Sequence, residues 1–273
     1  MIGKGRRFLF ILCCCGVALA QNPELGRVER NGNEAILIVE GPRPVDSAAS
    51  TLASEFGIRV NVEDPGYVFR DDVKDVTADV TRGARTARPV LIPKGGNLEV
   101  HFVLGTDGMP VDIAAVLRSL VDAANAKFPF QYRLDADGNW FTITPTRTRD
   151  QLGNSVPTVP LLDRHVTIPP GTRPIMQSAS LMTDALSAQT GLRVSCCQAA
   201  VAGVPWGLAE TFFEANDEPA RSVLKRLFTA AANGQPDRDY WLQRCDPLPS
   251  AWCFINLAHI SRTTVATRSL SIR

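Results

Sequence analysis

Histidine is scarce in this chain, which has only His101, His165 and His259 among its 273 residues. Histidine is the usual general base near neutral pH and a common metal ligand, so few candidates remain for acid–base catalysis or metal binding. All three lie in or just after expected strands, where such side chains are usually packed or half-exposed. The sequence motifs of zinc peptidases, serine hydrolases, P-loop proteins and dinucleotide-binding folds are also absent. We therefore expect no catalytic residue, no cofactor and no metal site.

An excess of charge of one sign is also missing. The formal net charge is +1, from 29 basic and 28 acidic residues. Lys4, Arg6 and Arg7 lie in a segment that we expect to be removed, which leaves 26 bases against 28 acids and a net charge near −2. A field this weak excludes strong electrostatic recruitment of nucleic acid or of an anionic membrane.

No segment after residue 20 is apolar enough over a sufficient length to be expected to span a bilayer. At the N-terminus, an apolar run at residues 8–19 follows basic residues and leads into Ala18-Leu19-Ala20. This pattern is typical of a secretory signal peptide, here residues 1–20. An uncleaved anchor and, because of the cysteines at 13–15, a lipoprotein are the alternatives. We expect the protein to be exported.

Seven cysteines occur, and three of them lie in the signal segment. The other four are Cys196, Cys197, Cys245 and Cys253. In an oxidising compartment, four cysteines predict disulfides. Cys245 and Cys253 flank a short stretch and would link a hairpin, but a link from Cys196 or Cys197 to either is equally allowed. Three pairings therefore stay open, with free thiols and a metal site as the alternatives.

The clearest positive feature is an internal duplication. Residues 57–60 (GIRV) match residues 191–194 (GLRV), and residues 116–124 (VLRSLVDAA) match residues 223–231 (VLKRLFTAA). Two matching segments in the same order predict two diverged copies of one small unit. Each copy reads as strand–helix–strand followed by strand–helix–strand–strand. A sheet with two helices on one face would bury the apolar stripes of both helices, so we predict an α+β fold.

The expected boundaries follow from periodicity and from turn residues. Apolar spacing predicts a helix at 45–56 that ends at Gly57, where glycine adopts a left-handed conformation without steric cost. Prolines and acidic residues mark three further boundaries: Pro110 in a first helical turn, 169–171 at a strand end, and 216–219 at a helix start. The segments are a signal peptide (1–20), a flexible lead-in (21–34), the first copy (35–145, with an insertion at 64–97), a linker (146–164), the second copy (165–257) and a polar tail (258–273).

Two groups of side chains are candidates for partner binding. The first is a basic loop within the insertion, formed by Arg82, Arg85 and Arg88. It would suit an acidic partner or an anionic ligand, and a solvated loop is the alternative. The second group consists of tryptophans of the second copy: Trp206, Trp241 and Trp252. Aromatic residues dominate interface hot spots, and packing in the core is the alternative.

The repeated unit resembles the STN domain, a short domain at the N-terminus of secretins and TonB-dependent receptors, and the related N-domains of secretins. The resemblance rests on the helix ending in Gly-x-x-Val, the helix carrying Val-Leu-x-x-Leu, and the closing hairpin at 140–143 or 252–255. The resemblance implies a docking module for envelope proteins, without catalytic residues, in the periplasm or cell envelope of a Gram-negative-type bacterium. The departures are the insertion, the cysteines, and the lack of a following secretin or barrel domain, so we expect the pair to stand alone.

These features favour a non-catalytic docking module that binds secretin or TonB-dependent receptor components. One hypothesis for its mechanism is that a partner peptide pairs with an exposed strand edge of one copy. The first alternative is a small-molecule or glycan binder that uses a cleft between the two copies. A degenerate enzyme with its site in the 64–97 loop is a further alternative.

Overall fold

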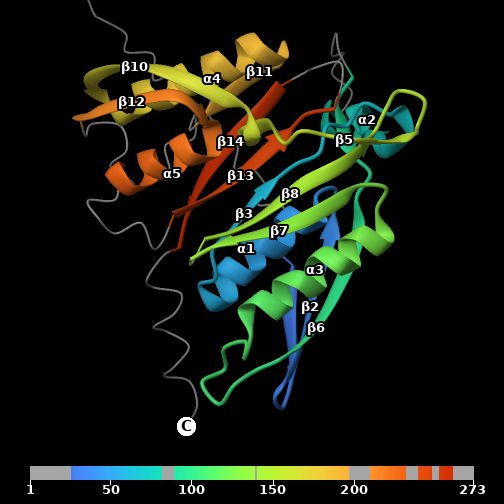
Figure 1. Cartoon of the computed structure of the whole chain (residues 1–273). Helices are drawn as coiled ribbons and strands as arrows, with labels where there is room; N and C mark the ends of the chain where they lie inside the picture. Colours follow the sequence, from blue (N-terminus) through green and yellow to red (C-terminus); the bar gives the residue numbers. More distant parts are fainter. Residues whose placement is uncertain are drawn as a thin grey trace, which may run out of the picture.

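The computed structural model describes residues 26–81, 89–138, 140–196, 210–231, 239–247 and 252–260. It has the predicted α+β fold (Figure 1). In its first part the elements are β1 (Arg27–Asn31), β2 (Glu34–Gly41), α1 (Pro44–Phe56), β3 (Val60–Glu63), β4 (Val73–Asp75), α2 (Thr77–Thr81), β5 (Leu91–Pro93), β6 (Gly96–Val103), α3 (Ile113–Lys127), β7 (Gln131–Asp137) and β8 (Trp140–Arg149). Those that follow are β9 (Ser155–Pro157), β10 (His165–Pro174), α4 (Ile175–Thr190), β11 (Arg193–Cys196), β12 (Glu210–Pro219), α5 (Ala220–Ala231), β13 (Asp239–Cys245) and β14 (Trp252–His259).

The elements form five layers in the order sheet, helices, sheet, helices, sheet. The central sheet has the strand order β11-β14-β13-β3-β8-β7. Helices α1 and α3 lie between one face of this sheet and an outer sheet β1-β2-β6, while α4 and α5 lie between its other face and an outer pair β10-β12. Figure 1 shows the two helix pairs on opposite sides of the central strands. Each helix pair is therefore covered by sheets on two faces, whereas the sequence predicted a sheet on one face only.

The two copies share one pattern of strand pairing. In the first copy β2 pairs with β6 in antiparallel fashion, β3 runs parallel to β8, and β8 forms a hairpin with β7. In the second copy β10 and β12, β11 and β14, and β13 and β14 repeat these three relations. The same order of elements with the same pairing supports the interpretation of the sequence as a duplication.

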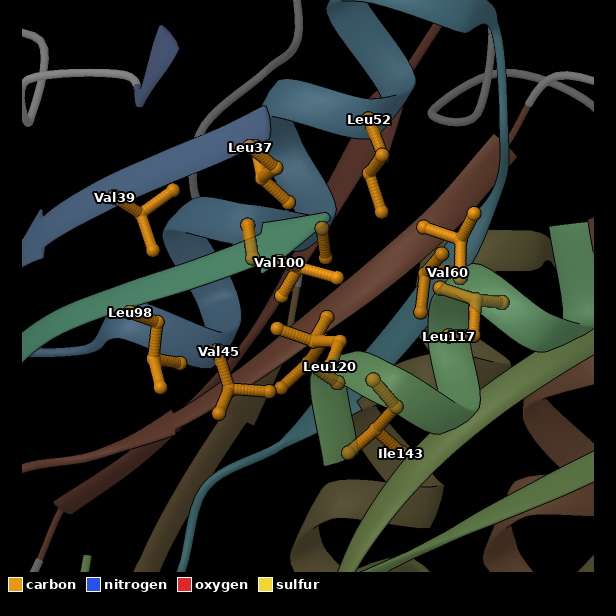
Figure 2. Close-up of a cluster of buried hydrophobic side chains, with 14 of the residues drawn as sticks. Leu37, Val39, Val45, Leu52, Val60, Leu98, Val100, Leu117, Leu120 and Ile143 are labelled. Carbon is orange, nitrogen blue, oxygen red and sulfur yellow. The ribbon is translucent and has the colours of Figure 1, made fainter. Parts of the chain in front are cut away.

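Two separate cores hold the layers together. Figure 2 shows part of the first, where side chains of β2, β6, α1 and α3 meet those of the central sheet. Its labelled members are Leu37, Val39, Val45, Leu52, Val60, Leu98, Val100, Leu117, Leu120 and Ile143. The second core lies under α4 and α5 and includes the fully buried Trp241 and Phe228. Strand β13 contributes to both, because Tyr240 and Leu242 face the first core while Trp241 faces the second.

The copies are joined by direct strand pairing within the central sheet. Strand β13 of the second copy runs parallel to β3 of the first, with Leu242 opposite Val62. The backbone N–H of Trp241 donates to the side-chain oxygen of Asn61 at 3.1 Å. On one face of this join, the buried Glu63 pairs with Arg221 of α5, with 2.8 Å between Oε1 and Nη2.

Helix ends follow the expected chemistry with one exception. Gly57 and Gly191 end α1 and α4 in the left-handed conformation at φ 67°, as predicted for Gly57. Helix α3 starts at Ile113 after the N-cap Asp112, whose carboxylate accepts from the Ala115 N–H at 2.8 Å. Pro110 therefore lies before the helix and not in its first turn, because the Asp112 side chain supplies the stronger start signal.

Four segments differ from the sequence-based expectation. The expected flexible lead-in contains β1, which pairs with β2 through a turn at Gly32. Residues 169–171 do not end a strand, since β10 continues through them with register shifts against β12. Residues 216–219 end β12 and do not start α5. In each case, pairing with a distant or neighbouring strand outweighs the local turn preference. The expected linker holds the end of β8, together with β9 and a short 3₁₀ turn.

Candidate functional site

A cleft of about 300 Å³ opens in the first copy. Its walls come from the start of α1, the end of β3, the insertion, the segment before β6 and the loop after α3. Apart from Arg149 in the expected linker, all of these lining residues belong to the first copy, so the cleft lies within that copy and its insertion and not in the space between the copies.

A buried polar network forms one wall of the cleft. Arg43 Nε lies 2.6 Å from Asp64 Oδ2, and the Tyr67 hydroxyl donates to Asp64 Oδ1 at 3.0 Å. Arg43 Nη2 also donates to the carbonyl oxygen of Cys245 at 2.8 Å. Burial raises the pKa of Tyr67 well above its ordinary value, so its hydroxyl keeps its proton. Since Cys245 belongs to β13, this wall of the cleft depends on the docking of the second copy.

Two buried carboxylates of the cleft each have an oxygen without a hydrogen-bond partner. Asp46 Oδ2 accepts from Arg244 and Asp72 Oδ1 lies 3.2 Å from Arg149 Nη1. The second oxygens, Asp46 Oδ1 and Asp72 Oδ2, are buried and unpartnered. Desolvation raises the pKa of both side chains, against the opposing effect of their arginine partners. Unpaired buried acceptors cost free energy, so such positions invite a hydrogen-bond donor.

Aromatic and basic side chains complete the cleft. Tyr67 and Phe130 pack edge to face with their ring centroids 5.4 Å apart, and Phe128 is half-buried beside them. Lys94 and Lys127 are exposed at the rim. The cleft therefore combines an apolar wall with separate positive and negative groups, as small-molecule sites commonly do.

A second candidate feature is an arginine stacked over a tryptophan in each copy. The Arg59 guanidinium lies 4.6 Å from the centroid of the Trp140 ring, and that of Arg193 lies 4.1 Å from the centroid of Trp252. The two pairs occupy matching positions of the duplication, because 57–60 corresponds to 191–194 and both tryptophans begin the closing strand.

The surroundings of the two pairs differ. In the first copy the pair is covered by the second copy, because Phe228 of α5 packs edge to face on Trp140 and Lys225 lies 5.7 Å from that ring. Arg59 is only 7% exposed. In the second copy Arg193 is exposed and Trp252 is half-buried beside Phe254, with the two ring centroids 4.3 Å apart. We refer to Arg193, Trp252 and Phe254 as the Arg–Trp face.

Of the tryptophans and arginines that the sequence offered as partner-binding candidates, one lies in the core, one is half-exposed and four lie outside the described residues. Trp241 is fully buried next to Phe228 and Trp140, so it belongs to the core and not to an exposed docking surface. Trp252 is half-exposed and remains a partner-binding candidate. The remaining candidates, Arg82, Arg85, Arg88 and Trp206, lie outside the described residues.

One predicted disulfide pairing is present. Cys245 and Cys253 are bonded, and they lie directly opposite each other on β13 and β14. Cys196 is disulfide-bonded as well, and Cys197 lies outside the described residues. The bond between Cys245 and Cys253 therefore links the two strands of the closing hairpin in the second copy. Cys245 is also the residue whose carbonyl oxygen accepts a hydrogen bond from Arg43.

The strand edges offer limited room for a partner strand. The outer edge of β3 is occupied by β13. On β11, the Val194 N–H donates to Ser187 Oγ at 2.9 Å. On β7, Arg133 and Asp137 are held in ion pairs with Asp163 and Lys225. Capped backbone groups and charged side chains are common protections of edge strands. The hypothesis of strand pairing at an exposed edge thus finds little support at these three strands.

The described residues show neither a metal-binding cluster nor a membrane-spanning helix. Among these residues, no group of three or more histidine, cysteine or acidic residues is arranged to hold a metal ion. Over the same ranges, no helix is both long enough and apolar enough to cross a bilayer. Comparisons of the chain with protein-family models, with curated proteins and with solved structures find no match.

Sequence reasoning missed the cleft and the match between the two Arg–Trp pairs. The cleft residues are separated by up to about a hundred positions, and no motif connects them. The Arg–Trp pairs did leave a signal, since both arginines and both tryptophans lie in segments that the duplication already aligned. Aligning the arginine and tryptophan residues of the two copies would have found them.

Proposed function

We propose that the protein is an exported, non-catalytic docking module of the cell envelope that binds partner proteins through its Arg–Trp face. The observation that carries the proposal is the unequal burial of the two matching Arg–Trp pairs. In the first copy the pair is covered by a helix of another unit, whereas in the second copy it is half-exposed. The STN-like organisation of each copy, seen in the sequence motifs, supports the same function.

The covered pair indicates what the open pair would bind. In the first copy the partner surface is one helix, α5, which supplies an aromatic side chain and a basic one, Phe228 and Lys225. We therefore expect the Arg–Trp face to receive a helix with an aromatic residue at its centre. Components of secretin or TonB-linked assemblies that carry domains of this kind are the proposed partners.

The residues of the face suit an interface hot spot. Tryptophan and arginine are enriched among residues whose truncation costs about 2 kcal/mol or more of binding free energy. Phe254 adds apolar area to Trp252, and Arg193 remains exposed above the ring. A loss of about 2 kcal/mol corresponds to roughly a 30-fold weaker complex.

The proposal can be tested by site-specific photo-crosslinking in cells that export the full chain. A photoreactive phenylalanine analogue replaces Phe254, and the same analogue at Glu99, on the outer face of β6, is the control. We expect a crosslinked envelope protein, identified by mass spectrometry, from the Phe254 site only. Adding Trp252→Ala should abolish this product while the melting temperature of the chain stays near that of the parent. Equal products from both sites, or a product that survives Trp252→Ala, would refute the proposal.

A second candidate function is small-molecule binding, and the first-copy cleft favours it. The cleft holds buried acceptor atoms without partners beside an aromatic wall, and a docking surface alone does not require either feature. The two functions use different parts of the molecule and are therefore compatible.

A further inference from the structure

We infer that the first-copy cleft binds a small zwitterion, either a free amino acid or a short peptide. The ammonium group would lie against Asp46 and Asp72, and the carboxylate would lie at the rim near Lys94 and Lys127. This inference rests on the second candidate function and gives it a ligand class, and it is independent of partner docking at the Arg–Trp face.

The buried carboxylates call for a positively charged hydrogen-bond donor. The side chains of Asp46 and Asp72 are only 5% and 6% exposed, and each uses one oxygen for an arginine. The other oxygen of each, Asp46 Oδ1 and Asp72 Oδ2, has no partner. An ammonium group carries three donors and one positive charge. It would satisfy these oxygens and favour their ionised form, through charge-assisted hydrogen bonds.

The rim calls for the opposite charge. Lys94 and Lys127 are exposed there, and Lys127 hydrogen-bonds only the neutral side chain of Asn97 among its described contacts. Over the whole lining, four basic side chains face four acidic ones: Arg43, Lys94, Lys127 and Arg149 against Asp46, Asp64, Asp71 and Asp72. A lining with equal numbers of basic and acidic side chains favours a ligand that is neutral overall but carries both charges.

The remaining surface suits a modest apolar group. Tyr67, Phe128, Phe130 and Tyr132 line the cleft, and its volume of about 300 Å³ lies at the lower end for small-molecule sites. The side chain of an amino acid or dipeptide would therefore contact the aromatic wall. The ammonium group of the ligand would reach Asp46 and Asp72, and its carboxylate would reach the rim.

Other ligand classes fit less well. A neutral sugar could donate hydroxyl groups to the carboxylates, but it would leave the two rim lysines without a charged partner. A dicarboxylate would place negative charge near Asp46 and Asp72, and a diamine would place positive charge near Lys94 and Lys127. Like charges at close range are unfavourable in a partly buried site.

Calorimetric titration of the full-length mature protein tests this inference. The probes are L-phenylalanine, N-acetyl-L-phenylalanine without the ammonium, L-phenylalaninamide without the carboxylate, and maltose as the sugar. We expect L-phenylalanine to bind and each blocked derivative to bind about 10-fold more weakly or worse, as the loss of one charge-assisted contact implies. Asp72→Asn and Lys94→Met should each weaken L-phenylalanine binding by a similar factor, whereas Glu99→Gln, remote from the cleft, should not.

The outcomes separate the ligand class from the site. Binding of maltose with no binding of L-phenylalanine would overturn the zwitterion inference while leaving a small-molecule site in place. Absence of binding for every probe up to about 10 mM would overturn both the zwitterion inference and the small-molecule site. Because the blocked probes are compared on the unmodified protein, the test stands even where a cleft variant fails to fold.

Discussion

Replacing Glu63 with glutamine should remove a pH dependence of folding that arises where the two copies join. Glu63 is fully buried, and its carboxylate accepts from Arg221 Nε at 2.9 Å. Burial raises the pKa of Glu63 from 4.5 to about 7, against the opposing effect of Arg221, while Asp163 nearby adds to the increase. At about 1.4 kcal/mol for each pKa unit, this difference corresponds to about 3 kcal/mol of stability.

The direction of the effect follows from proton uptake. Because the pKa of Glu63 is higher in the folded protein, the folded state keeps a proton that the unfolded chain has released between pH 4.5 and about 7. The stabilising contribution is complete below pH 4.5 and is lost as the pH rises through about 7. The wild-type free energy of unfolding should therefore fall with rising pH, relative to that of Glu63→Gln, by up to about 3 kcal/mol.

Urea unfolding followed by tryptophan fluorescence measures this difference. Wild type, Glu63→Gln and the exposed control Glu99→Gln are compared at about pH 5 and about pH 8, which bracket most of the transition. Other titrating groups contribute equally to all three proteins and cancel in the comparison. We expect wild type and Glu99→Gln to lose the same amount of stability, and Glu63→Gln to lose clearly less. An identical loss in all three proteins would show that Glu63 does not hold its proton as inferred.

Two further predictions concern stability. Trp241→Ala removes a fully buried ring that packs between Phe228 and Trp140, and it should lower the unfolding free energy by about 3–5 kcal/mol in urea; a loss below about 1 kcal/mol would contradict its place in the core. Gly57→Ala forces a side chain into a left-handed position at φ 67° and should cost about 1–2 kcal/mol. Gly66→Ala, where open space surrounds the glycine, is the matched control and should melt close to wild type.

The four long helices and most strands could be predicted from the sequence, because each is encoded by local periodicity, whereas the short helix α2 was not predicted. The apolar stripe of α3 and the glycines after α1 and α4 mark these helices within a few residues. The disulfide between Cys245 and Cys253 was among the pairings that the sequence allowed, and strand pairing selected it by placing the two residues opposite each other.

Part of the candidate sites was also within reach of the sequence. Trp252 was a candidate from composition alone, and its equivalence to Trp140 followed from the duplication. The exposure of Trp252 could not be predicted, because the sequence does not say which copy's tryptophan is covered by the other copy. Trp241 illustrates the same gap: the apolar run at residues 240–242 predicts a strand, but only the second helix layer determines that this side chain is buried.

The sequence by itself determined the two repeated units, the order of their main elements and the C-terminal ends of α1 and α4, since these depend on residues close together in the chain. The tertiary structure alone decided that β13 pairs with β3, that the two helix pairs lie on opposite faces of one sheet, and that Asp46 and Asp72 line one cleft. These features depend on contacts between residues far apart in sequence. No local pattern encodes such contacts, because many distant partners satisfy the same apolar or hydrogen-bonding preference.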